Sequence, residues 1–457
     1  MIHQENNQVA PLRLEVLGAR GRAQIHRAVL QVMECPGVRV HDEESRSLLV
    51  SAGARLAADD FVSFPRQVIE AALHGIPGNL CLYNRNGGRA LDTANQRPSF
   101  ATGLFCHNIL DHRSGRLRPY LLHDVIEAAQ LCDRLDNINL LGSLGLPSDV
   151  SAGEAPLRAI DAVMKHSSKP LFFYGNDLTQ SSAIWEMVAK ESGGWSRLAK
   201  TPTALDLIGP TSPLTLDSQA CQRLLFNARR RLPTACFSAV IPGVSGPVTL
   251  AGALVQASAE SLAGIILHQA AQPGAPIMSG SNVLTMDLRT GNIAYAAPEY
   301  SLVCEAAAEY FSSLAIPTWV GGGHSDAHTV DGQAAAEAGM NLGWTAMSSS
   351  RLIHNLGYLS SGKTASFEML VLGDEIASAV IRLSAGIQVD ETSLAVDEIR
   401  QQAANGNFLA SSHTVEYCRQ EFTSPKLFQR LGLEKWHDMG ASDVTERIKE
   451  KIATILH

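Results

Sequence analysis

The chain has 457 residues, of which 45% are hydrophobic and 18% charged, and its formal net charge is -8. A chain of this length can bury a large core. Its charged fraction lies below the usual quarter, which indicates surface hidden in subunit contacts, so we expect a homo-oligomer. The 37 Lys and Arg residues are scattered and form no basic stripe, so we do not expect a nucleic acid as a partner.

The sequence predicts a cytoplasmic protein. Residues 1–8 have neither a basic stretch nor an apolar core of the kind found in secretory signals. Nowhere do 18 apolar residues run uninterrupted, so we expect no membrane-spanning helix and no membrane partner. The eight cysteines are widely spaced and form no CxxC pair, which is typical of reduced thiols.

The first 115 residues are predicted to form a helical lead-in followed by a small strand-rich patch. Asp42 is a plausible helix N-cap with two acidic residues behind it, and Pro65 suits the first turn of a helix. Asn86-Gly87-Gly88 follows an apolar run and is a hairpin turn signal.

Residues 116–385 alternate between short apolar runs and helical patterns. Such repeated units indicate a parallel sheet buried on both faces, and seven units favour an α/β fold with a closed TIM (β/α)8 barrel. An open doubly wound sheet is the alternative. Residues 386–457 are predicted to form a helical extension packed on the barrel, ending in an amphipathic helix at 443–455. The predicted strands are 138–141, 171–174, 205–208, 237–241, 277–279, 318–320 and 352–354, and the predicted helices are 124–135, 219–230, 250–269, 301–314 and 332–347.

In such a barrel the functional site lies at the carboxyl ends of the strands. The segments that follow the predicted strands are small and polar, and all seven contain glycine, which suits a wide mouth that a bulky partner can approach. Glycine, asparagine and serine are also the ordinary residues of such turns. These segments are 142–143, 175–177, 209–212, 242–246, 280–282, 321–326 and 355–358.

Residues 321–328 form the densest polar cluster. Three glycines, Gly321, Gly322 and Gly323, precede a predicted helix and could cradle a phosphate, although no P-loop motif is present. His324, Asp326 and His328 could be metal ligands, but side chains at this spacing do not face one way on a helix. We therefore predict no metal site.

A second cluster follows the last predicted strand. His354 and Glu368 could act as an acid and a base, or could bind a charged substrate. Tyr358 lies between them, and an aromatic wall beside a carboxylate can bind a quaternary ammonium. Tyr174 is a further wall candidate. A lone histidine in an apolar run is, however, often a core residue.

Several ordered segments together resemble the trimethylamine methyltransferase family of corrinoid-dependent methyltransferases, and the likeness covers nearly the whole chain. The resemblance implies a TIM barrel of one-carbon metabolism, related to methanogenesis enzymes, that moves a methyl group from a methylated amine to the Co(I) of a partner corrinoid protein. The segments that carry it are Gly246-Pro247-Val248-Thr249-Leu250-Ala251-Gly252-Ala253, Gly274-Ala275-Pro276, Met286-Asp287-Leu288-Arg289-Thr290-Gly291, Ser325-Asp326-Ala327, Asp331-Gly332-Gln333, Tyr358-Leu359, Ser366-Phe367-Glu368-Met369 and Asn407-Phe408-Leu409.

One departure from the family pattern concerns pyrrolysine. The founding trimethylamine enzymes carry it, whereas this sequence has only the twenty standard residues. The chain therefore resembles the non-pyrrolysine branch, which demethylates quaternary amines such as glycine betaine and leaves a tertiary amine, here dimethylglycine. His328 is a second departure, because many relatives are expected to have lysine there.

The resemblance and the strand-end positions together imply a set of roles. Tyr358, Glu368 and Asp326 would surround the cation, and His354, His324 or an arginine would hold the betaine carboxylate, with Tyr174 and Asn176 nearby. The nucleophile is Co(I), so no acid, base or covalent residue is required. The residues expected to face a corrinoid, carried by a partner protein or bound free, are Gly321, Gly322, Gly323, Ser245, Gly246, Ser281 and Asn282.

Three other functions stay open at this point. An aldolase or lyase needs a Schiff-base lysine or a metal cluster at a strand end, and Lys363 is the only lysine near the predicted mouth. A noncatalytic barrel subunit would fill the mouth with bulky apolar residues. A methyltransferase that uses S-adenosylmethionine would carry a glycine-rich loop after its first strand.

Overall fold

The structure is a computed structural model and describes residues 13–95, 97–404 and 406–456. At its centre, eight parallel strands form a sheet whose order around the barrel follows the chain. A bridge between Leu141 and Leu171 joins the second strand to the third and completes the ring. The predicted TIM barrel is confirmed, and the open sheet is excluded. The strands are β6 (Ser99–Thr102), β9 (Ile138–Leu140), β10 (Leu171–Phe173), β11 (Ala204–Ile208), β13 (Thr234–Cys236), β14 (Ile277–Gly280), β17 (Thr318–Gly321) and β18 (Leu352–Leu356).

Two strands differ from the sequence prediction. The first barrel strand, β6, lies within the first 115 residues, so the barrel begins before the predicted boundary at 116. β13 ends at Cys236, whereas the prediction placed a strand at 237–241. That run is apolar because Phe237 and Val240 are buried beyond the end of the strand, at 5% and 0% exposure. A buried loop therefore has the same run of apolar residues as a buried strand.

Helices surround the barrel, and each predicted helix is present with a start within three residues of its prediction. Their first turns are fixed by side-chain caps, because Asp177, Asp217, Thr249, Asp331 and Ser366 each accept a hydrogen bond from a backbone N–H two or three residues later. The helices are α4 (Leu122–Arg134), α5 (Ala155–His166), α6 (Leu178–Glu191), α7 (Trp195–Leu198), α8 (Ser218–Arg229), α9 (Leu250–Ala271), α10 (Pro298–Ser313), α11 (Gly332–Ala346) and α12 (Phe367–Ser384).

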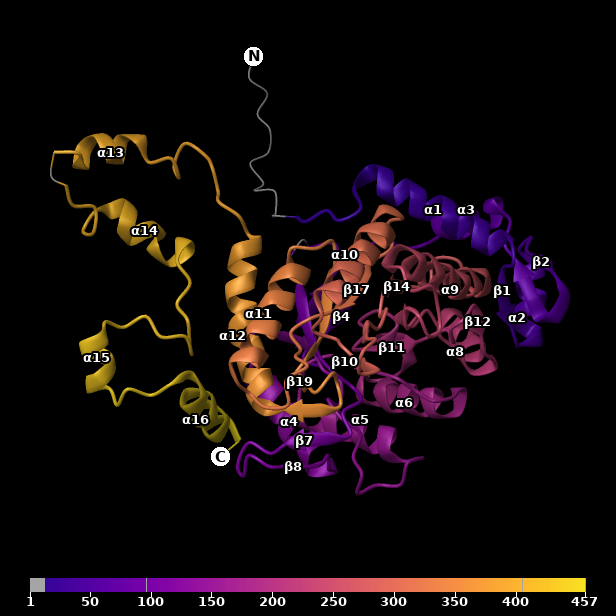
Figure 1. Cartoon of the computed structure of the whole chain (residues 1–457), viewed down its shortest axis with the longest axis horizontal. Helices are drawn as coiled ribbons and strands as arrows, with labels where there is room; N and C mark the ends of the chain where they lie inside the picture. Colours follow the sequence, from indigo (N-terminus) through magenta and orange to yellow (C-terminus); the bar gives the residue numbers. More distant parts are fainter. Residues whose placement is uncertain (1–12, 96, 405, 457) are drawn as a thin grey trace, which may run out of the picture.

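The N-terminal segment covers one side of the barrel (Figure 1). Its helices share a hydrophobic core with α9, and β1 pairs with β12 (Thr215–Leu216) from the barrel. α9 is apolar enough to span a membrane by composition, but 72% of that stretch is buried here, as in a core helix. The N-terminal elements are α1 (Gly18–Glu34), β1 (Val38–Val40), α2 (Glu43–Ser51), β2 (Arg55–Leu56), a 3-10 turn at Ala58–Asp60, β3 (Phe61–Ser63) and α3 (Arg66–His74).

A hairpin closes the amino-terminal end of the barrel. β4 (Cys81–Tyr83) and β5 (Arg89–Asp92) flank the predicted Asn86-Gly87 turn, where Gly87 has a φ of +91°. Leu82 and Leu91 of the hairpin are buried in the same cluster as the inward side chains of the barrel strands. The hairpin side chains therefore cover the amino-terminal end of the barrel interior, and we expect a ligand to enter at the carboxyl ends of the strands.

Short strands frame that open end. β7 (Asn108–Leu110) and β8 (Leu117–Pro119) form one sheet with β19 (Tyr358–Leu359) and β20 (Thr364–Ser366), which follow the first and the last barrel strands. β15 (Met286–Asp287) and β16 (Asn292–Ile293) form a hairpin after β14.

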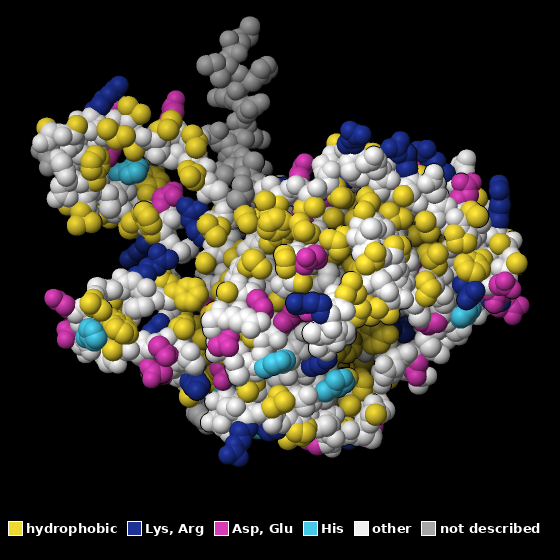
Figure 2. Space-filling model, in the orientation of Figure 1, with side chains coloured by type: hydrophobic (Ala, Val, Ile, Leu, Met, Phe, Trp, Pro, Cys, Tyr) yellow, Lys and Arg dark blue, Asp and Glu magenta, His cyan; other side chains and the backbone are white. Residues whose placement is uncertain are grey.

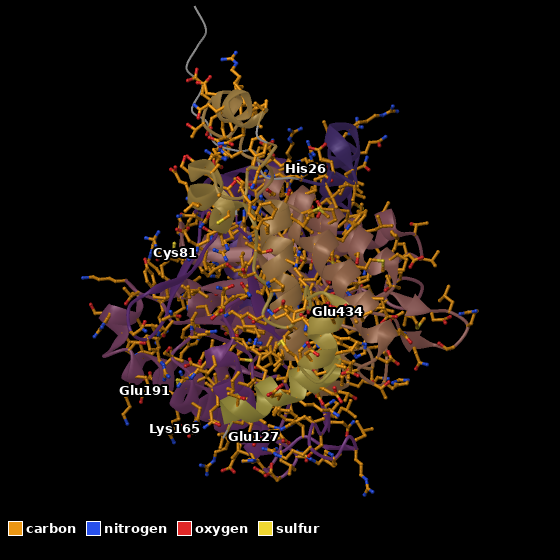
Figure 3. All side chains as sticks on the ribbon, turned by 90° about the vertical axis from the view of Figure 1, so that its left-hand side faces the viewer. His26, Cys81, Glu127, Lys165, Glu191 and Glu434 are labelled. Atoms are coloured by element: carbon orange, nitrogen blue, oxygen red, sulfur yellow. The ribbon has the colours of Figure 1, made fainter. Side chains whose placement is uncertain are left out.

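The C-terminal extension differs from its expected packing. α16 (Val444–Leu456) lies against the body and buries Ile448 and Ile452. α13 (Val396–Gln402), α14 (Ser412–Glu421) and α15 (Leu433–Asp438) stand away from the body and bury no side chain (Figure 1). Figure 3 views the molecule from this side, with Glu434 marking α15.

Candidate functional site

Inside the barrel, aromatic side chains from several strands pack in one layer. His354 of β18 lies edge-on to Trp319 of β17, with ring centroids 4.9 Å apart, and 6.2 Å from Phe237. Trp319 in turn makes edge contacts with Phe237 and Phe172 at 5.4 and 5.2 Å. Alternate residues of each strand point inward, and this brings rings from β10, β17 and β18 into contact, together with Phe237, the residue just after β13.

His354 is held in its neutral form. Its Nδ1 lies 2.9 Å from the carbonyl oxygen of Val320, and because a carbonyl only accepts, Nδ1 carries the proton. Burial lowers the pKa of His354 to about 4. Nε2 is therefore a bare acceptor at neutral pH and has no hydrogen-bond partner among the residues that the structure describes. A bare acceptor cannot donate to a carboxylate, so the predicted carboxylate-binding role does not fit His354.

Tyr358 organises the opposite part of the mouth. The N–H groups of Leu104 and Phe105 donate to its hydroxyl oxygen at 2.7 and 3.1 Å. The Tyr358 ring lies so close to Gly103 that a Cβ there would overlap it. The pKa of Tyr358 is raised well above its usual value by burial. Tyr358 is 4% exposed, so it supports the wall of the mouth more than it lines it.

Phe105 and Tyr174 form the outer wall. Their rings meet edge to face at 5.7 Å, and Phe105 is 43% exposed. The guanidinium of Arg223 lies 4.8 Å from the Tyr174 ring centre. Arg223 is buried and pairs with the buried carboxylate of Asp206, so its charge is already neutralised. Asn176, two residues beyond Tyr174 in the loop after β10, is exposed.

His324 is fully buried in a second aromatic group. Its ring lies 5.4 Å from Tyr295 and 5.3 Å from Tyr300, and its Nε2 donates to the Tyr295 carbonyl at 2.9 Å. Nδ1 is buried and unpartnered within the described part of the chain. Burial lowers the pKa of His324. With no exposed surface, His324 is a core residue in this structure and not a donor for a substrate carboxylate.

Asp326 is occupied by loop contacts. Its carboxylate accepts from the N–H groups of Tyr295 and Ala296 at 3.1 and 3.0 Å, and from the Ser361 hydroxyl at 2.8 Å. These bonds join the loops after β14, β17 and β18. Asp326 therefore fixes the rim of the mouth, and its oxygens are already satisfied.

Glu368 lies apart from His354. Its carboxylate accepts from the Ser366 hydroxyl at 3.0 Å, and burial, the largest influence, raises its pKa. The charged groups that act on it are Lys449 of α16 and Asp111 of the β7–β8 hairpin. The structure thus places Glu368 against the C-terminal helix and does not bring it to the aromatic layer.

Close packing explains why residues 321, 322 and 323 are glycines. All three are buried, and a Cβ on Gly321 would overlap the Tyr300 hydroxyl. A Cβ on Gly322 would lie 2.6 Å from the Thr345 hydroxyl, and Gly323 has a φ of +75°. Their contact with a corrinoid stays a prediction, and they offer it no exposed surface here.

The other residues expected near a corrinoid lie on the loops after β13 and β14. Ser245 and Gly246 are half-buried, whereas Ser281 is buried and uses its hydroxyl to accept from the Val283 N–H at 3.0 Å. Asn282 is half-buried and accepts from the Tyr300 hydroxyl at 3.1 Å. A cavity of about 510 Å³ opens between these loops, and its lining includes Pro242, Val248, Leu250, Met286, Leu288 and Ala297.

A second cavity, of about 400 Å³, lies at the amino-terminal end of the barrel. Arg89, Asp92 and Asp136 are among its lining residues. Function in this fold resides at the other end, so we assign this cavity no part in the site.

Sequence reasoning missed the centre of the site. Trp319 and Phe237 both lie in runs that were interpreted as strands, and the alternation of inward and outward residues could have identified them. It singled out the segment 355–358 but gave no role to Asn355, a buried residue with a φ of +83° within β18. A non-glycine residue in this region indicates backbone strain of the kind found at functional sites.

The mouth is a poor site for acid–base or metal chemistry. Its buried tyrosines have raised pKa values, about 12 for Tyr295, and His354 and His324 have lowered ones. Within the described ranges there is no group of three or more His, Cys, Asp or Glu side chains that could hold a metal ion. Lys363 is exposed, on the turn between β19 and β20. The arrangement can enclose and orient an apolar or cationic molecule.

Fold and site together define a (β/α)8-barrel protein with a neutral, aromatic binding mouth. The chain belongs to the trimethylamine methyltransferase (MTTB) family, whose model matches residues 3–457. Membership of this family makes it a methyltransferase.

Its curated relatives support this assignment along the whole chain. A trimethylamine methyltransferase MttB of Desulfitobacterium hafniense is 28% identical, over 98% of this chain and 92% of that protein. One from Methanosarcina thermophila is 30% identical, over 94% and 90%. A glycine betaine methyltransferase of Desulfitobacterium hafniense is 28% identical, over 90% and 86%.

A solved structure supports the fold. The monomethylamine methyltransferase MtmB of Methanosarcina barkeri matches with a TM-score of 0.53 at 10% identity, covering 98% of this chain and 89% of that one.

Proposed function

We propose that this cytoplasmic enzyme transfers a methyl group from a quaternary amine, with glycine betaine as the leading substrate, to the Co(I) of a corrinoid protein. The tertiary amine, dimethylglycine in that case, is the other product. The observation that carries the proposal is the neutral aromatic layer of Phe237, Trp319 and His354 at the mouth. The similarity to a glycine betaine methyltransferase supports the choice of substrate.

The chemistry of a quaternary donor matches this site. Its nitrogen carries a permanent positive charge, so the amine departs neutral and no proton has to be supplied. A tertiary amine is a poor methyl donor unless it is protonated or captured by an electrophile. The histidine of the layer has a pKa of about 4 and cannot protonate an amine near neutral pH.

In the aromatic layer the rings open to a cation are those of Phe237 and His354, which are 5% and 7% exposed, whereas Trp319 is fully buried and packs against both. Ring faces attract a desolvated cation by about 2 kcal/mol or more. The unprotonated Nε2 of His354 adds a partial negative charge in the same place. We therefore assign His354 to the ammonium end of the substrate rather than to its carboxylate. The protein's task is to hold the methyl carbon in line with its acceptor and to exclude water.

The rim is suited to a protein partner that carries the acceptor. Val244, Val248 and Leu288 are 60–66% exposed on the loops beside the 510 Å³ cavity. When bound, the corrinoid supplies a strongly nucleophilic cobalt. The exposed rim residues therefore suit a corrinoid that another protein brings to the rim. The buried glycines 321–323 offer no cradle for a corrinoid bound permanently to this chain.

Spectroscopy provides the direct test. The protein is mixed with reduced cob(I)alamin and with glycine betaine, proline betaine, carnitine or trimethylamine, and formation of methylcob(III)alamin is followed. We expect methylation with glycine betaine and none with trimethylamine. Methylation by trimethylamine but by no betaine would refute the branch assignment. The absence of methylation by any amine, with the cognate corrinoid protein also supplied, would refute the proposed reaction.

A matched pair of variants tests the aromatic layer itself. Phe237→Leu removes a ring from the mouth, whereas Phe173→Leu removes an equally buried ring that faces Trp185 outside the barrel. Loss of one cation–ring contact should raise KM for the betaine roughly 5- to 30-fold in the first variant only. Equal effects in both would show that the ring at 237 does not contact the substrate.

A further inference from the structure

Asn355 occupies an irregular position at the end of β18. Among the eight barrel strands, all of which the structure describes, it alone has a positive φ, at +83°. Three residue steps along β18, from Ile353 to Leu356, match only two along β6, so β18 carries a β-bulge here. Bulges are common at barrel rims and beside active sites, where they change the direction in which a side chain points. The direction of the Asn355 side chain is therefore set by this bulge and not by the regular alternation of the strand.

The Asn355 amide lies on the inner side of the barrel wall. Trp319 points inward, and Gly321, two residues further along β17, faces the same side. A Cβ on Gly321 would lie 2.9 Å from the amide nitrogen of Asn355 and would overlap the Tyr300 hydroxyl. The amide thus shares the inner side with the ring of His354, which contacts Trp319.

The side-chain amide of Asn355 is unpaired. Within the described part of the chain it makes no hydrogen bond, and the nearby Tyr300 hydroxyl donates instead to Asn282, at 3.1 Å. Asn355 is only 3% exposed, yet its amide is not sealed off as the buried Trp319 nitrogen is. A glycine would adopt the same φ without strain, so the backbone does not require an amide at this position. The two N–H donors of the amide are therefore open to a ligand in the mouth.

The negative end of the proposed substrate still needs a partner. His354 presents a bare acceptor to the mouth, and the charge of Arg223 is neutralised by Asp206. The chain carries a net charge of -8, and on the face drawn in Figure 2 the Lys and Arg side chains lie mostly at the edges. Lys363 is exposed on the rim, but water screens an exposed ion pair and leaves it weak. Selection of a carboxylate therefore has to come from a buried hydrogen-bond donor.

We propose that the Asn355 amide donates a hydrogen bond to the carboxylate of the methyl donor, and so selects betaines over quaternary amines that lack a carboxylate. The inference rests on the proposed function, because it concerns the second end of the same substrate. His354, at the ammonium end, directly precedes Asn355, so one strand end can hold both ends of a molecule as short as glycine betaine. A hydrogen bond to a carboxylate is charge-assisted and roughly twice as strong as a neutral one. Since an amide is neutral, it places no cation beside the ammonium, as an arginine would.

Binding of two ligands, measured by calorimetry without any corrinoid, tests the proposal. One ligand is glycine betaine, and the other is ethyltrimethylammonium, in which a methyl group replaces the carboxylate. We expect the wild-type protein to bind glycine betaine more tightly by about 10- to 100-fold, the range for a hydrogen bond to a charged group. Thermal melting verifies that every variant is folded.

Two variants keep the bulge and change only the side chain. Glycine adopts a positive φ freely and aspartate tolerates it, so Asn355→Gly and Asn355→Asp both suit the backbone. Asn355→Gly should lose the preference for glycine betaine. Asn355→Asp should reverse it, because a carboxylate at this position repels the carboxylate of the betaine and attracts the cation of the analogue. A purely structural role for Asn355 would shift both affinities in the same direction and would overturn the proposal.

Lys363→Gln is the control, since it removes the exposed ammonium of the rim and should keep the wild-type preference. Loss of the preference in this variant, with none in Asn355→Gly, would overturn the proposal and assign the carboxylate to the lysine. If the wild-type protein bound both ligands equally, binding of quaternary amines would stand and only this inference would fail. If it bound neither ligand, the proposed function would fail as well.

Discussion

Removing the hydroxyl of Tyr358 tests how the mouth is held open. In Tyr358→Phe the ring still packs on Gly103, so the change deletes one oxygen and leaves the volume of the wall intact. That oxygen accepts two backbone N–H groups, from Leu104 at 2.7 Å and from Phe105 at 3.1 Å. Both donors lose their partner, and the segment that carries Phe105 into the mouth is released.

The expected cost follows from the burial of these donors. An unsatisfied buried N–H costs about 1–3 kcal/mol. The Leu104 contact is buried, whereas the Phe105 contact is half-buried and can recover part of its hydration. We therefore expect a loss of about 2 kcal/mol in the free energy of unfolding. A chain of this size should show it as a fall of a few degrees in melting temperature, measured by calorimetry at constant protein concentration.

Tyr174→Phe is the matched control. Its hydroxyl makes no hydrogen bond within the part of the chain that the structure describes, and its ring meets the same Phe105 at 5.7 Å. We expect a change within about 0.5 kcal/mol for this variant. The reasoning is refuted if Tyr358→Phe melts at the same temperature as Tyr174→Phe, because the two N–H groups would then have other acceptors.

Three further changes have defined outcomes. Arg223→Met leaves the buried Asp206 carboxylate without its cation and should cost about 3–5 kcal/mol in chemical denaturation, with partial recovery on adding Asp206→Asn. Because burial lowers the folded-state pKa of His354 to about 4, wild-type stability should fall by roughly 3 kcal/mol between pH 6.5 and 4, and His354→Gln should lack this part of the fall. Burial raises the pKa of Glu305 to about 8, so its contribution to stability declines from pH 4.5 to 8; Glu305→Gln should gain up to roughly 5 kcal/mol over wild type at pH 8 and none near pH 4.

The barrel could be predicted because its signals are local. Apolar runs bounded by glycine and proline gave six of the eight strands, and caps such as Asp42 and Asp331 fix where helices begin. β6 was not predicted, because it is only four residues long and lies among other short strands in the N-terminal patch. β13 was misplaced because a buried loop carries the same hydrophobicity as a buried strand.

The site was harder to predict because it depends on which side chains point into the barrel. Polar residues at strand ends pointed to the right end of the barrel, yet Asp326 bonds to neighbouring loops and Glu368 lies against α16. Sequence position indicates that a side chain lies near the mouth but not whether it turns inward. The inward residues proved to be aromatic ones such as Trp319, whose type is equally common in cores.

Among the residues that the structure describes, the contacts of the aromatic layer involve rings and no free carboxylate, and this has a kinetic meaning for the proposed reaction. The donor nitrogen loses its positive charge as the methyl group departs, so any contact that binds the full cation tightly stabilises the ground state more than the transition state. A carboxylate such as Asp326, turned toward the substrate, would therefore lower KM and slow the transfer. Rings and the neutral His354 bind the cation more weakly and lose less as the charge disperses. On this argument, introducing an acid into the layer, as in Phe237→Glu, should lower kcat for the betaine even where KM improves, and a variant that raised both rate and affinity would contradict it.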